Sequence, residues 1–350
     1  MERGAAGMED KSPAVFFLAA NTSAGFYSIY EDLVSPERAD KIWYIKGGPG
    51  NGKSTFMRRV AAAAEAAGCR VEYILCSGDP ASLDGIHILD TNTVYVDATA
   101  PHVQEPTLPG ICGRYLDLSQ FYKSSISVDR EDASGLIRGY KKKYERAYEL
   151  LSAAGKAAPA NIPGAIPQEE QERLRSQGYE KALQLLPVVD GGNTTRRFLS
   201  ANSCSGFLSL PETACSYGSV FLLQGGAAFF WLSGFAEGCV ERGQSTILCP
   251  DPLCPDRLDA VIAPEAGVSF LTAHRGIRYP KEAVRHKLEG EPGADYTQEK
   301  ALRNALLRQA YGYLKEAKDL HDRLEELYRP AVDFKALDRF ADKHIREQIR

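Results

Sequence analysis

The chain has 350 residues, of which 44% are hydrophobic and 25% charged, and its formal net charge at pH 7 is −4. This composition is ordinary for a folded protein, and the length is enough for two domains of common size. Charges of both signs are interspersed, so no basic field exists to attract a nucleic-acid backbone or an anionic membrane surface. We therefore expect neither nucleic acid nor membrane among the partners.

The cysteines and the N-terminal segment point to the cytoplasm. The eight cysteines form no CxxC pair and no usual zinc spacing, which favours reduced thiols. Near the start, the apolar patch VFFLAA at residues 15–20 is too short for the core of a signal peptide.

The clearest local pattern lies at residues 41–67. Ile42 to Ile45 are β-branched or aromatic and predict a short buried strand, whereas residues 56–67 are rich in helix formers and end at Gly68. Between them, Gly47-x4-Gly52-Lys53-Ser54 matches the phosphate-binding loop, or P-loop, at every fixed position. The sequence thus predicts a strand, a glycine loop and a helix in the order that this motif requires.

These residue types suit a nucleotide. Glycines let successive backbone N–H groups curl around a phosphate, and the helix begins with its positive end facing the anion. We expect Lys53 to reach the β- and γ-phosphates, Ser54 to supply a hydroxyl ligand to Mg²⁺, and Thr55 to lie near the α-phosphate. The predicted nucleotide-binding residues are Gly47, Gly48, Pro49, Gly50, Asn51, Gly52, Lys53, Ser54 and Thr55.

A P-loop also needs a carboxylate to orient the metal. Residues 93–96 predict a buried strand, and Asp97 follows at its carboxyl end, where α/β proteins place ligands. Asp97 is therefore the predicted second metal ligand, although it could merely cap the following turn. Asp79, in an Asp-Pro turn, and Asp84, interpreted as a surface residue, are weaker candidates.

The catalytic base is less clear. Many ATP-hydrolysing P-loop proteins carry a glutamate after the aspartate, but residue 98 is alanine. Slow hydrolysis, phosphoryl transfer to an acceptor and switching by bound nucleotide are therefore favoured over vigorous hydrolysis. His102 and Glu105 are the nearest alternatives for a base or a metal-shell role. Arg114, Arg138, Arg275 and Arg278 each remain open as a charge-stabilising finger.

Two further stretches have helical patterning. Residues 128–155 and 167–186 are separated by an Ala/Pro/Gly-rich segment, and residues 296–347 are similarly helical and highly charged. Each half of the chain is thus expected to be an α/β core followed by a long pair of helices. The lysines at 141–143 are interpreted as a solvated helix face.

An internal repeat relates the two halves. FLAANTSAGF at 17–26 recurs 181 residues later as FLSANSCSGF at 198–207, with six of ten positions identical. Further matches between the two halves follow in order, separated by 178 and then 175 residues. At an offset of 178, Gly52 corresponds to Phe230, Lys53 to Trp231 and Ser54 to Leu232, and Asp97 corresponds to about Leu271. Because these positions are apolar, and because the bulky Phe230 and Trp231 side chains would occupy phosphate space without a cation, we expect the second unit not to bind a nucleotide in the usual way and each chain to have one nucleotide site.

The repeat also bears on FLLQGGAAFFWLSG at 221–234, an uncharged run that by itself could be part of a membrane helix. The alignment instead predicts a strand at Phe221–Gln224, a turn at Gly225 and Gly226, and a helix that starts at Phe229–Leu232.

The chain resembles a little-characterised bacterial family of predicted ATPases built from two tandem P-loop units. The resemblance rests on GGPGNGKST at 47–55, CSGDPASLDGIHI at 76–88, DATAPHVQEPTLPG at 97–110 and the repeated ten-residue segment. Three departures are Ala98 for the expected glycine, Glu105 for the expected aspartate, and the loss of the second P-loop. The resemblance implies ATP and a cytoplasmic location, and it implies no particular substrate.

Together these observations predict an α/β fold of two tandem P-loop NTPase-like three-layer α/β/α units with mainly parallel sheets. The first unit spans 13–190, with a helical extension at about 126–190, and the second spans 191–350, with a helical extension at about 296–347.

Three functions are consistent with the pattern. The leading prediction is a Mg²⁺-dependent ATP-binding protein that acts as an ATPase. The alternatives are a small-molecule kinase, whose acceptor site would use the loop after Asp97, and a non-enzymatic, nucleotide-gated interaction module. GTP is less favoured because no Asn-Lys-x-Asp motif is present. A protein partner and a homo-oligomer both remain open.

Overall fold

The first unit is built on a six-stranded sheet. The computed structural model describes residues 13–100, 103–123, 128–162, 165–288 and 296–349. Within them, the first sheet comprises β1 (Ala14–Phe16), β4 (Lys41–Lys46), β5 (Val71–Leu75), β6 (Leu83–Ile88), β7 (Thr93–Asp97) and β8 (Gly113–Asp117). Their order is β1-β5-β6-β7-β4-β8, and β4 runs parallel to both of its neighbours. Only β6 is antiparallel to the strands beside it.

The second unit repeats this topology strand for strand. Its sheet comprises β9 (Thr194–Arg196), β12 (Ser219–Gln224), β13 (Thr246–Pro250), β14 (Leu258–Ala263), β15 (Val268–Thr272) and β16 (Val284–Lys287). The order is β16-β12-β15-β14-β13-β9, in which β14 alone is antiparallel to its neighbours. The structure thus has two mainly parallel sheets with one topology, as expected from the sequence repeat.

Two hairpins join the units around an approximate two-fold relation. They are β2 (Ala19–Thr22) with β3 (Gly25–Ser28), and β10 (Ser200–Ser203) with β11 (Gly206–Ser209). Phe17 and Phe198 exchange backbone hydrogen bonds of 2.9 and 2.8 Å. The buried amides of Asn21 and Asn202 each donate to the other's backbone carbonyl, at 2.8 and 3.0 Å. The repeated segment therefore forms the contact between the units, which we call the seam. Its two buried asparagine side chains are satisfied by hydrogen bonds to the corresponding residue of the other unit.

One apolar core fills the space between the two sheets. It contains Ile42 and Val96 from the first sheet, Leu222 and Ile262 from the second, and aromatic residues of the seam such as Phe17. On their opposite faces the sheets are covered by helices. The expected three-layer α/β/α arrangement of each unit is therefore incorrect in one respect: the second layer over each sheet is formed by the hairpins and the other unit.

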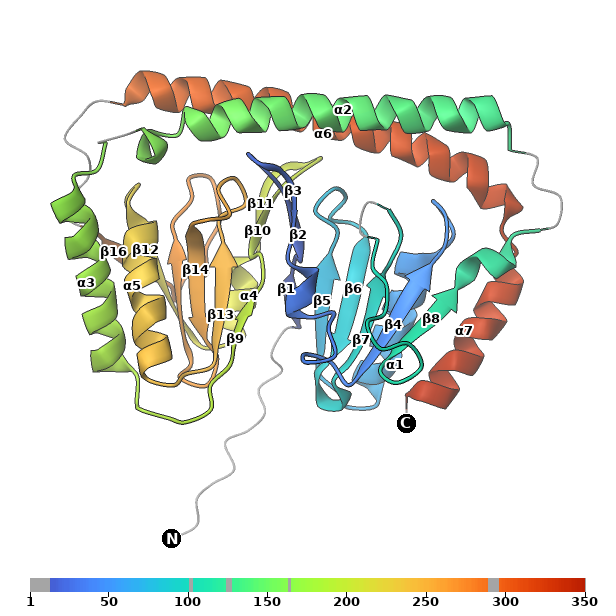
Figure 1. Cartoon of the computed structure of the whole chain (residues 1–350), viewed down its shortest axis with the longest axis horizontal. Helices are drawn as coiled ribbons and strands as arrows, with labels where there is room; N and C mark the ends of the chain where they lie inside the picture. Colours follow the sequence, from blue (N-terminus) through green and yellow to red (C-terminus); the bar gives the residue numbers. More distant parts are fainter. Residues whose placement is uncertain (1–12, 101–102, 124–127, 163–164, 289–295, 350) are drawn as a thin grey trace, which may run out of the picture.

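The helical extensions cross from one unit to the other. Helix α2 (Arg130–Lys156) lies antiparallel to α6 (Thr297–Tyr328), and the two span both units along one edge (Figure 1). After α2, α3 (Gln168–Leu185) packs on α5 (Ala228–Glu241) of the second unit. After α6, α7 (Phe334–Gln348) packs on α1 (Lys53–Ala66) of the first unit. Each core is therefore completed by a helix that follows the other core in the chain.

The apolar run at 221–234 forms a strand, a turn and a helix, as the repeat predicted. It comprises the end of β12, the Gly225–Gly226 turn and the first half of α5. The sheet lies on one side of α5 and α3 on the other, where Gly234 meets the carbonyl of Arg175 and Gly238 meets Ala182. Burial on both sides explains why the first half of the helix has no charged side chain. None of the helices in the described ranges is long and apolar enough to span a bilayer.

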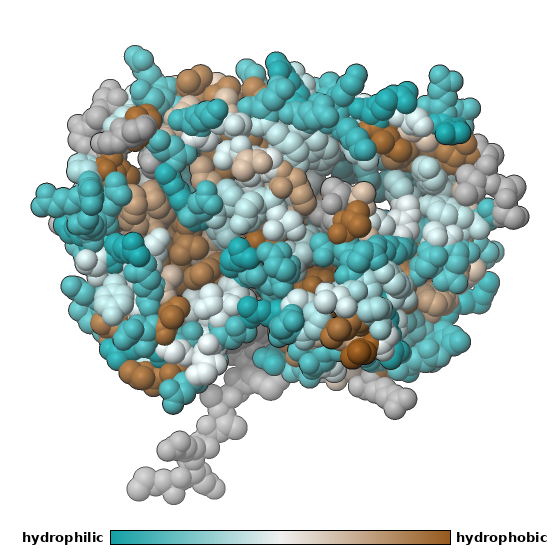
Figure 2. All heavy atoms as spheres, viewed as in Figure 1, coloured by the Kyte–Doolittle hydropathy of each residue, from teal (hydrophilic) through white to brown (hydrophobic). Residues whose placement is uncertain are grey.

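The remaining expected helices are also present. Residues 128–155, 167–186 and 296–347 correspond to α2, α3 and the α6–α7 pair. In the lysine cluster, Lys143 pairs with Glu316 of α6, whereas Lys141 and Lys142 are exposed. Figure 2 shows hydrophilic side chains over most of α2, with apolar side chains in separate groups elsewhere on that face.

Candidate functional site

The predicted P-loop lies at the carboxyl end of β4. The strand is parallel to β7 and β8, and its residues Ile42 to Ile45 are buried. The chain turns through Gly50 and Gly52, whose φ angles of 65° and 86° lie in the left-handed region, and α1 begins at Lys53. Glycine adopts this region without the cost that a side chain imposes, so the sequence pattern and the backbone agree here.

Lys53 and Asp97 come together beside this loop. Because β7 is parallel to β4 with Asp97 opposite Ile45, the carboxylate lies at the same sheet edge as the loop. The Lys53 ammonium donates to the carbonyls of Gly47 and Gly48 at 2.9 and 3.0 Å and lies 3.6 Å from Asp97 Oδ2. Both side chains are mostly buried, with 13% and 16% exposed. Asp97 Oδ1 accepts hydrogen bonds from the Thr99 backbone and hydroxyl, which fixes the carboxylate.

Ser54 and Thr55 start the helix in different environments. The Ser54 hydroxyl oxygen accepts a hydrogen bond of 3.0 Å from the Leu83 backbone N–H, whereas Thr55 is exposed. A hydroxyl oxygen has two acceptor positions. Ser54 therefore keeps one lone pair and its proton for a further partner.

Asn51 is the unusual side chain of the loop. It is only 1% exposed, yet its amide nitrogen and oxygen have no hydrogen-bond partner in the part of the chain that the structure describes. A buried polar group without a partner is costly, and functional sites are one place where such groups occur. A Cβ atom at Gly47 would lie 2.5 Å from Asn51 Oδ1, so a larger residue there would require the Asn51 side chain to move.

Three residues from outside the motif also lie against the loop. The Tyr122 hydroxyl, which follows β8, is so close to Gly48 that a Cβ there would overlap with it. From the far end of the chain, a Cβ at Gly50 would lie 2.9 Å from the Glu325 carbonyl of α6, and one at Gly52 would lie 3.1 Å from Leu337 of α7. We call residues 325–337 the C-terminal corner. Nothing in the local sequence indicated that it meets the P-loop.

The two proposed alternatives for a catalytic base have different outcomes. Glu105 Oε1 is 2.7 Å from Lys46 Nζ, and Tyr115 donates a hydrogen bond to the same carboxylate. The hydrogen bonds from Lys46 and Tyr115 lower the pKa of Glu105. No described contact joins Glu105 to Lys53 or Asp97, which makes it a poor candidate for a base at the loop. His102 lies outside the described residues.

The second unit corrects the predicted residue correspondence. The strands β4 and β12 are related by 178 positions (219 − 41), but the helices α1 and α5 are related by 175 (228 − 53). Three residues are therefore missing between them, where the loop runs from Gly225 to Ala227. The structural counterpart of Lys53 is Ala228.

The corrected counterparts change the role of the aromatic residues. Gly52 corresponds to Ala227, Ser54 to Phe229 and Asp97 to Thr272, in place of Phe230, Leu232 and Leu271. Trp231 corresponds to Phe56, and its ring packs on Phe235 and Phe270 in the core. Trp231 therefore does not fill phosphate space. Ala228 and Phe229 lack the ammonium and hydroxyl groups of Lys53 and Ser54, but Thr272 keeps a hydroxyl oxygen at the position of Asp97, so the expectation that all of these positions are apolar is wrong there.

The weaker candidates also have defined places. Asp84 lies within β6 and is 5% exposed, so its interpretation as a surface residue was wrong. Asp79 accepts hydrogen bonds from the Ala81 backbone and the Ser82 hydroxyl, as expected for a turn. Arg114, on β8, lies over the ring of Trp43, on the neighbouring strand β4. Arg275 and Arg278 follow β15 in the second unit.

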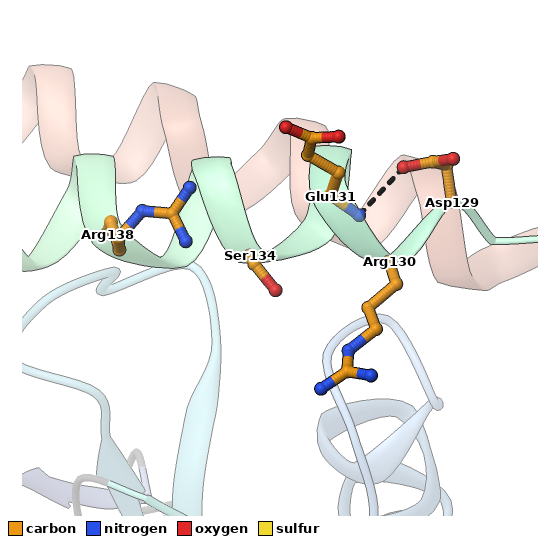
Figure 3. A pocket seen from close by; sticks show the side chains of 5 residues that line it. All are labelled: Asp129, Arg130, Glu131, Ser134 and Arg138. Atoms are coloured by element: carbon orange, nitrogen blue, oxygen red, sulfur yellow. Dashed lines mark hydrogen bonds between the residues drawn. The ribbon is translucent and has the colours of Figure 1, made fainter.

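Arg138 lines a shallow hollow of about 430 Å³ at the start of α2. Figure 3 shows Arg130, Ser134 and Arg138 along the helix, with Asp129 capping its first turn. Because the carboxylates of Asp129 and Glu131 line the same hollow, its charge is mixed and we assign no ligand to it.

Comparison with known protein families, with curated proteins and with solved structures finds no match to this chain. Functional inference therefore depends on the geometry of the chain itself.

Proposed function

We propose that the first unit binds ATP with Mg²⁺ at residues 47–55 and that each chain has one such site. The observation that carries this proposal is the position of Lys53, at the start of α1 and 3.6 Å from Asp97 on the neighbouring parallel strand. A strand, a glycine loop and a helix with this lysine and this carboxylate form the arrangement that P-loop proteins use for nucleoside triphosphates.

The phosphates would be bound by exchange of contacts within the loop. Lys53 now donates to the carbonyls of Gly47 and Gly48, and a phosphate oxygen is a stronger, charged acceptor for the same ammonium group. Asn51 offers unpaired amide groups at the same place. The first N–H groups of α1 have no partners within the helix and add a positive dipole end.

The residues also fit Mg²⁺. Ser54 supplies a hydroxyl oxygen and Asp97 a carboxylate, which are hard oxygen donors of the kind that this ion prefers. No three His, Cys, Asp or Glu side chains within the described ranges gather into a preformed metal site, so the phosphates and water would complete the coordination. A bound Mg²⁺ would neutralise charge on the β- and γ-phosphates.

We further propose that hydrolysis is slow. The side chain at position 98 is a buried alanine, which cannot activate water, and Glu105 is held by Lys46. We expect ATP turnover by the protein alone below about 1 s⁻¹, the lower end of typical enzyme rates.

Calorimetric titration with ATP and Mg²⁺ tests the proposal. We expect one ATP per chain and a loss of affinity of about 10- to 100-fold in Lys53→Ala, because the phosphates lose a charge-assisted partner. Lys142→Ala, which removes an exposed lysine of α2, is the matched control and should bind as the wild type does. Equal affinity in wild type and Lys53→Ala would refute the site, and two ATP molecules per chain would refute the assignment of the second unit.

One observation favours a second candidate, a nucleotide-gated interaction module. The C-terminal corner contacts Gly50 and Gly52 directly, so a change in the loop would be transmitted to α6, which spans both units. Hydrogen exchange at residues 325–337 should then differ with and without ATP in the wild type but not in Lys53→Ala. Rapid multiple turnover of ATP by the protein alone would count against this module.

A further inference from the structure

The second unit has a cavity where the first unit has its P-loop. Its volume is about 380 Å³, at the small end of the range of ligand pockets. The main lining residues are Gln224, Gly225, His274, Arg275, Tyr279 and Arg285. They come from the carboxyl end of β12, the loop after β15 and the adjacent strand β16.

The position of this cavity is that of a ligand site in an α/β protein. Strand β12 is parallel to both β15 and β16, and the cavity lies beside the carboxyl end of β12 and the end of β15. Ligands of open α/β sheets bind at this edge. Because the loop from Gly225 to Ala227 is three residues shorter than its counterpart, the ligand would be held by other groups than those of a P-loop.

Those groups are two guanidinium groups. Arg275 and Arg285 both line the cavity, and neither forms an ion pair with a carboxylate of the described residues. The Arg285 guanidinium lies 5.9 Å from the centre of the Tyr279 ring. Among the described residues, these two arginines without acidic partners offer two positive charges to a ligand in one concave site.

The side of the cavity that carries Arg275 is held in place by partly buried hydrogen bonds. The Tyr279 hydroxyl accepts from the His274 backbone N–H at 2.7 Å and donates to the Thr272 carbonyl at 3.2 Å. His274 Nε2 is 2.7 Å from Asp259 Oδ1, and Asp259 is 5% exposed. Burial would lower the pKa of His274, but Asp259 raises it, so the histidine charge is matched on this side of the cavity. The Asp259 carboxylate thus pairs with His274, and no described ion pair joins it to Arg275 or Arg285.

We propose that this cavity binds the phosphoryl group of a small phosphorylated molecule through Arg275 and Arg285. A guanidinium group binds phosphate oxygens in a bidentate manner, and a phosphate monoester is a dianion near neutral pH, which matches the two charges. The volume of the cavity limits the ligand to a small molecule. This site is separate from the ATP site, and its proposal does not rest on ATP binding.

The test uses the full chain with Lys53→Ala, which removes the lysine of the first unit. The probes are inorganic pyrophosphate and glycerol 3-phosphate, with succinate as a dicarboxylate of similar charge, each titrated by calorimetry. We expect one phosphorylated probe per chain and at least a tenfold loss of affinity when Arg275→Gln and Arg285→Gln are added. Arg278→Gln is the control, because this exposed arginine does not line the cavity.

Each other outcome overturns the proposal. No binding of either phosphorylated probe, or equal affinity with and without the two glutamine substitutions, would remove the site. Tighter binding of succinate would overturn the phosphoryl assignment. Both arginines are exposed, so the variants should fold, and each single substitution provides an independent measurement if the double variant does not. Loss of ATP binding in Lys53→Ala together with retained probe binding separates this site from the first.

Discussion

His344 should make the docking of α7 sensitive to pH. Its ring lies 4.8 Å from the ring of Trp43 and 5.5 Å from that of Phe56, and its Nε2 is 3.0 Å from the Tyr95 hydroxyl. The residue is 6% exposed. Burial lowers the pKa of His344 to about 4; Glu347 opposes this shift, and Lys41 adds to it.

The magnitude follows from linkage. An unfolded histidine has a pKa of about 6.5, so the unfolded chain takes up a proton that the folded chain does not. The contribution of neutral His344 to stability is therefore complete above pH 6.5 and is lost as the pH falls toward 4. With these two pKa values, the free energy of unfolding should fall by about 2 kcal/mol between pH 7 and pH 5.

Urea unfolding at pH 7 and pH 5, compared between wild type and His344→Phe, measures this contribution. Phenylalanine keeps the aromatic packing, and its loss of the hydrogen bond to Tyr95 gives an offset that does not depend on pH. The other five of the six histidines are the same in both proteins, so their effects cancel in the comparison. The reasoning would be refuted by an equal pH-dependent loss in the two proteins.

Three further predictions concern packing, charge and the loop. Gly234→Ala should lower the free energy of unfolding by about 1–3 kcal/mol, because its Cβ would overlap with a carbonyl of α3; Gly135→Ala, with open space around it, should not. Glu72 is buried against Arg197 (Nε–Oε1 2.7 Å); burial would raise its pKa, but Arg197 and the hydrogen bonds lower it to about 2. Stability should therefore fall as the pH drops from 4.5 to 2, and Arg197→Met should remove this dependence and cost about 3–5 kcal/mol in urea unfolding. Gly50→Ala should increase hydrogen exchange at the end of α6, because φ is 65° and a carbonyl of that helix lies 2.9 Å away; unchanged protection would contradict the contact.

Local signals predicted the elements of the first site well. The buried strand Ile42–Ile45, the glycine loop and the helix after it are each determined by neighbouring residues. The position of Asp97 beside Lys53 also followed, because both residues come directly after strands that pair in parallel. Such inferences need only short-range patterns and the general rule for the carboxyl edge of a sheet.

The contacts of the C-terminal corner could not be predicted in this way. The 32 residues of α6 extend about 48 Å, which is enough to reach from one unit to the other. The sequence, however, contains no signal for the direction in which this helix runs relative to the two sheets. Gly50 and Glu325 are far apart in the chain and meet only because α6 lies against α2. The same holds for Tyr122, whose hydroxyl approaches Gly48.

The three-residue error in the second unit has a physical cause. A shift of three residues rotates a helix by about 300°, only about 60° short of a full turn, so residues three apart share a helix face and the apolar pattern changes little. The first half of helix α5 is buried by the sheet on one side and by α3 on the other, and it has no charged side chain to mark a solvent face. Its pattern therefore fits the core equally well at an offset of 178 or 175, and only the structure distinguishes Trp231 as the counterpart of Phe56.

The position of the missing residues explains how the two units could diverge in function without losing the fold. The deletion lies between β12 and α5, at the sheet edge, whereas the reciprocal hydrogen bonds of Asn21 and Asn202 and the exchange of α3 and α7 lie elsewhere. The shorter loop of the second unit thus changes the sheet edge and leaves these packing contacts in place. Arg275 and Arg285 occupy the same edge, so a new anion site there would require no change in the shared core.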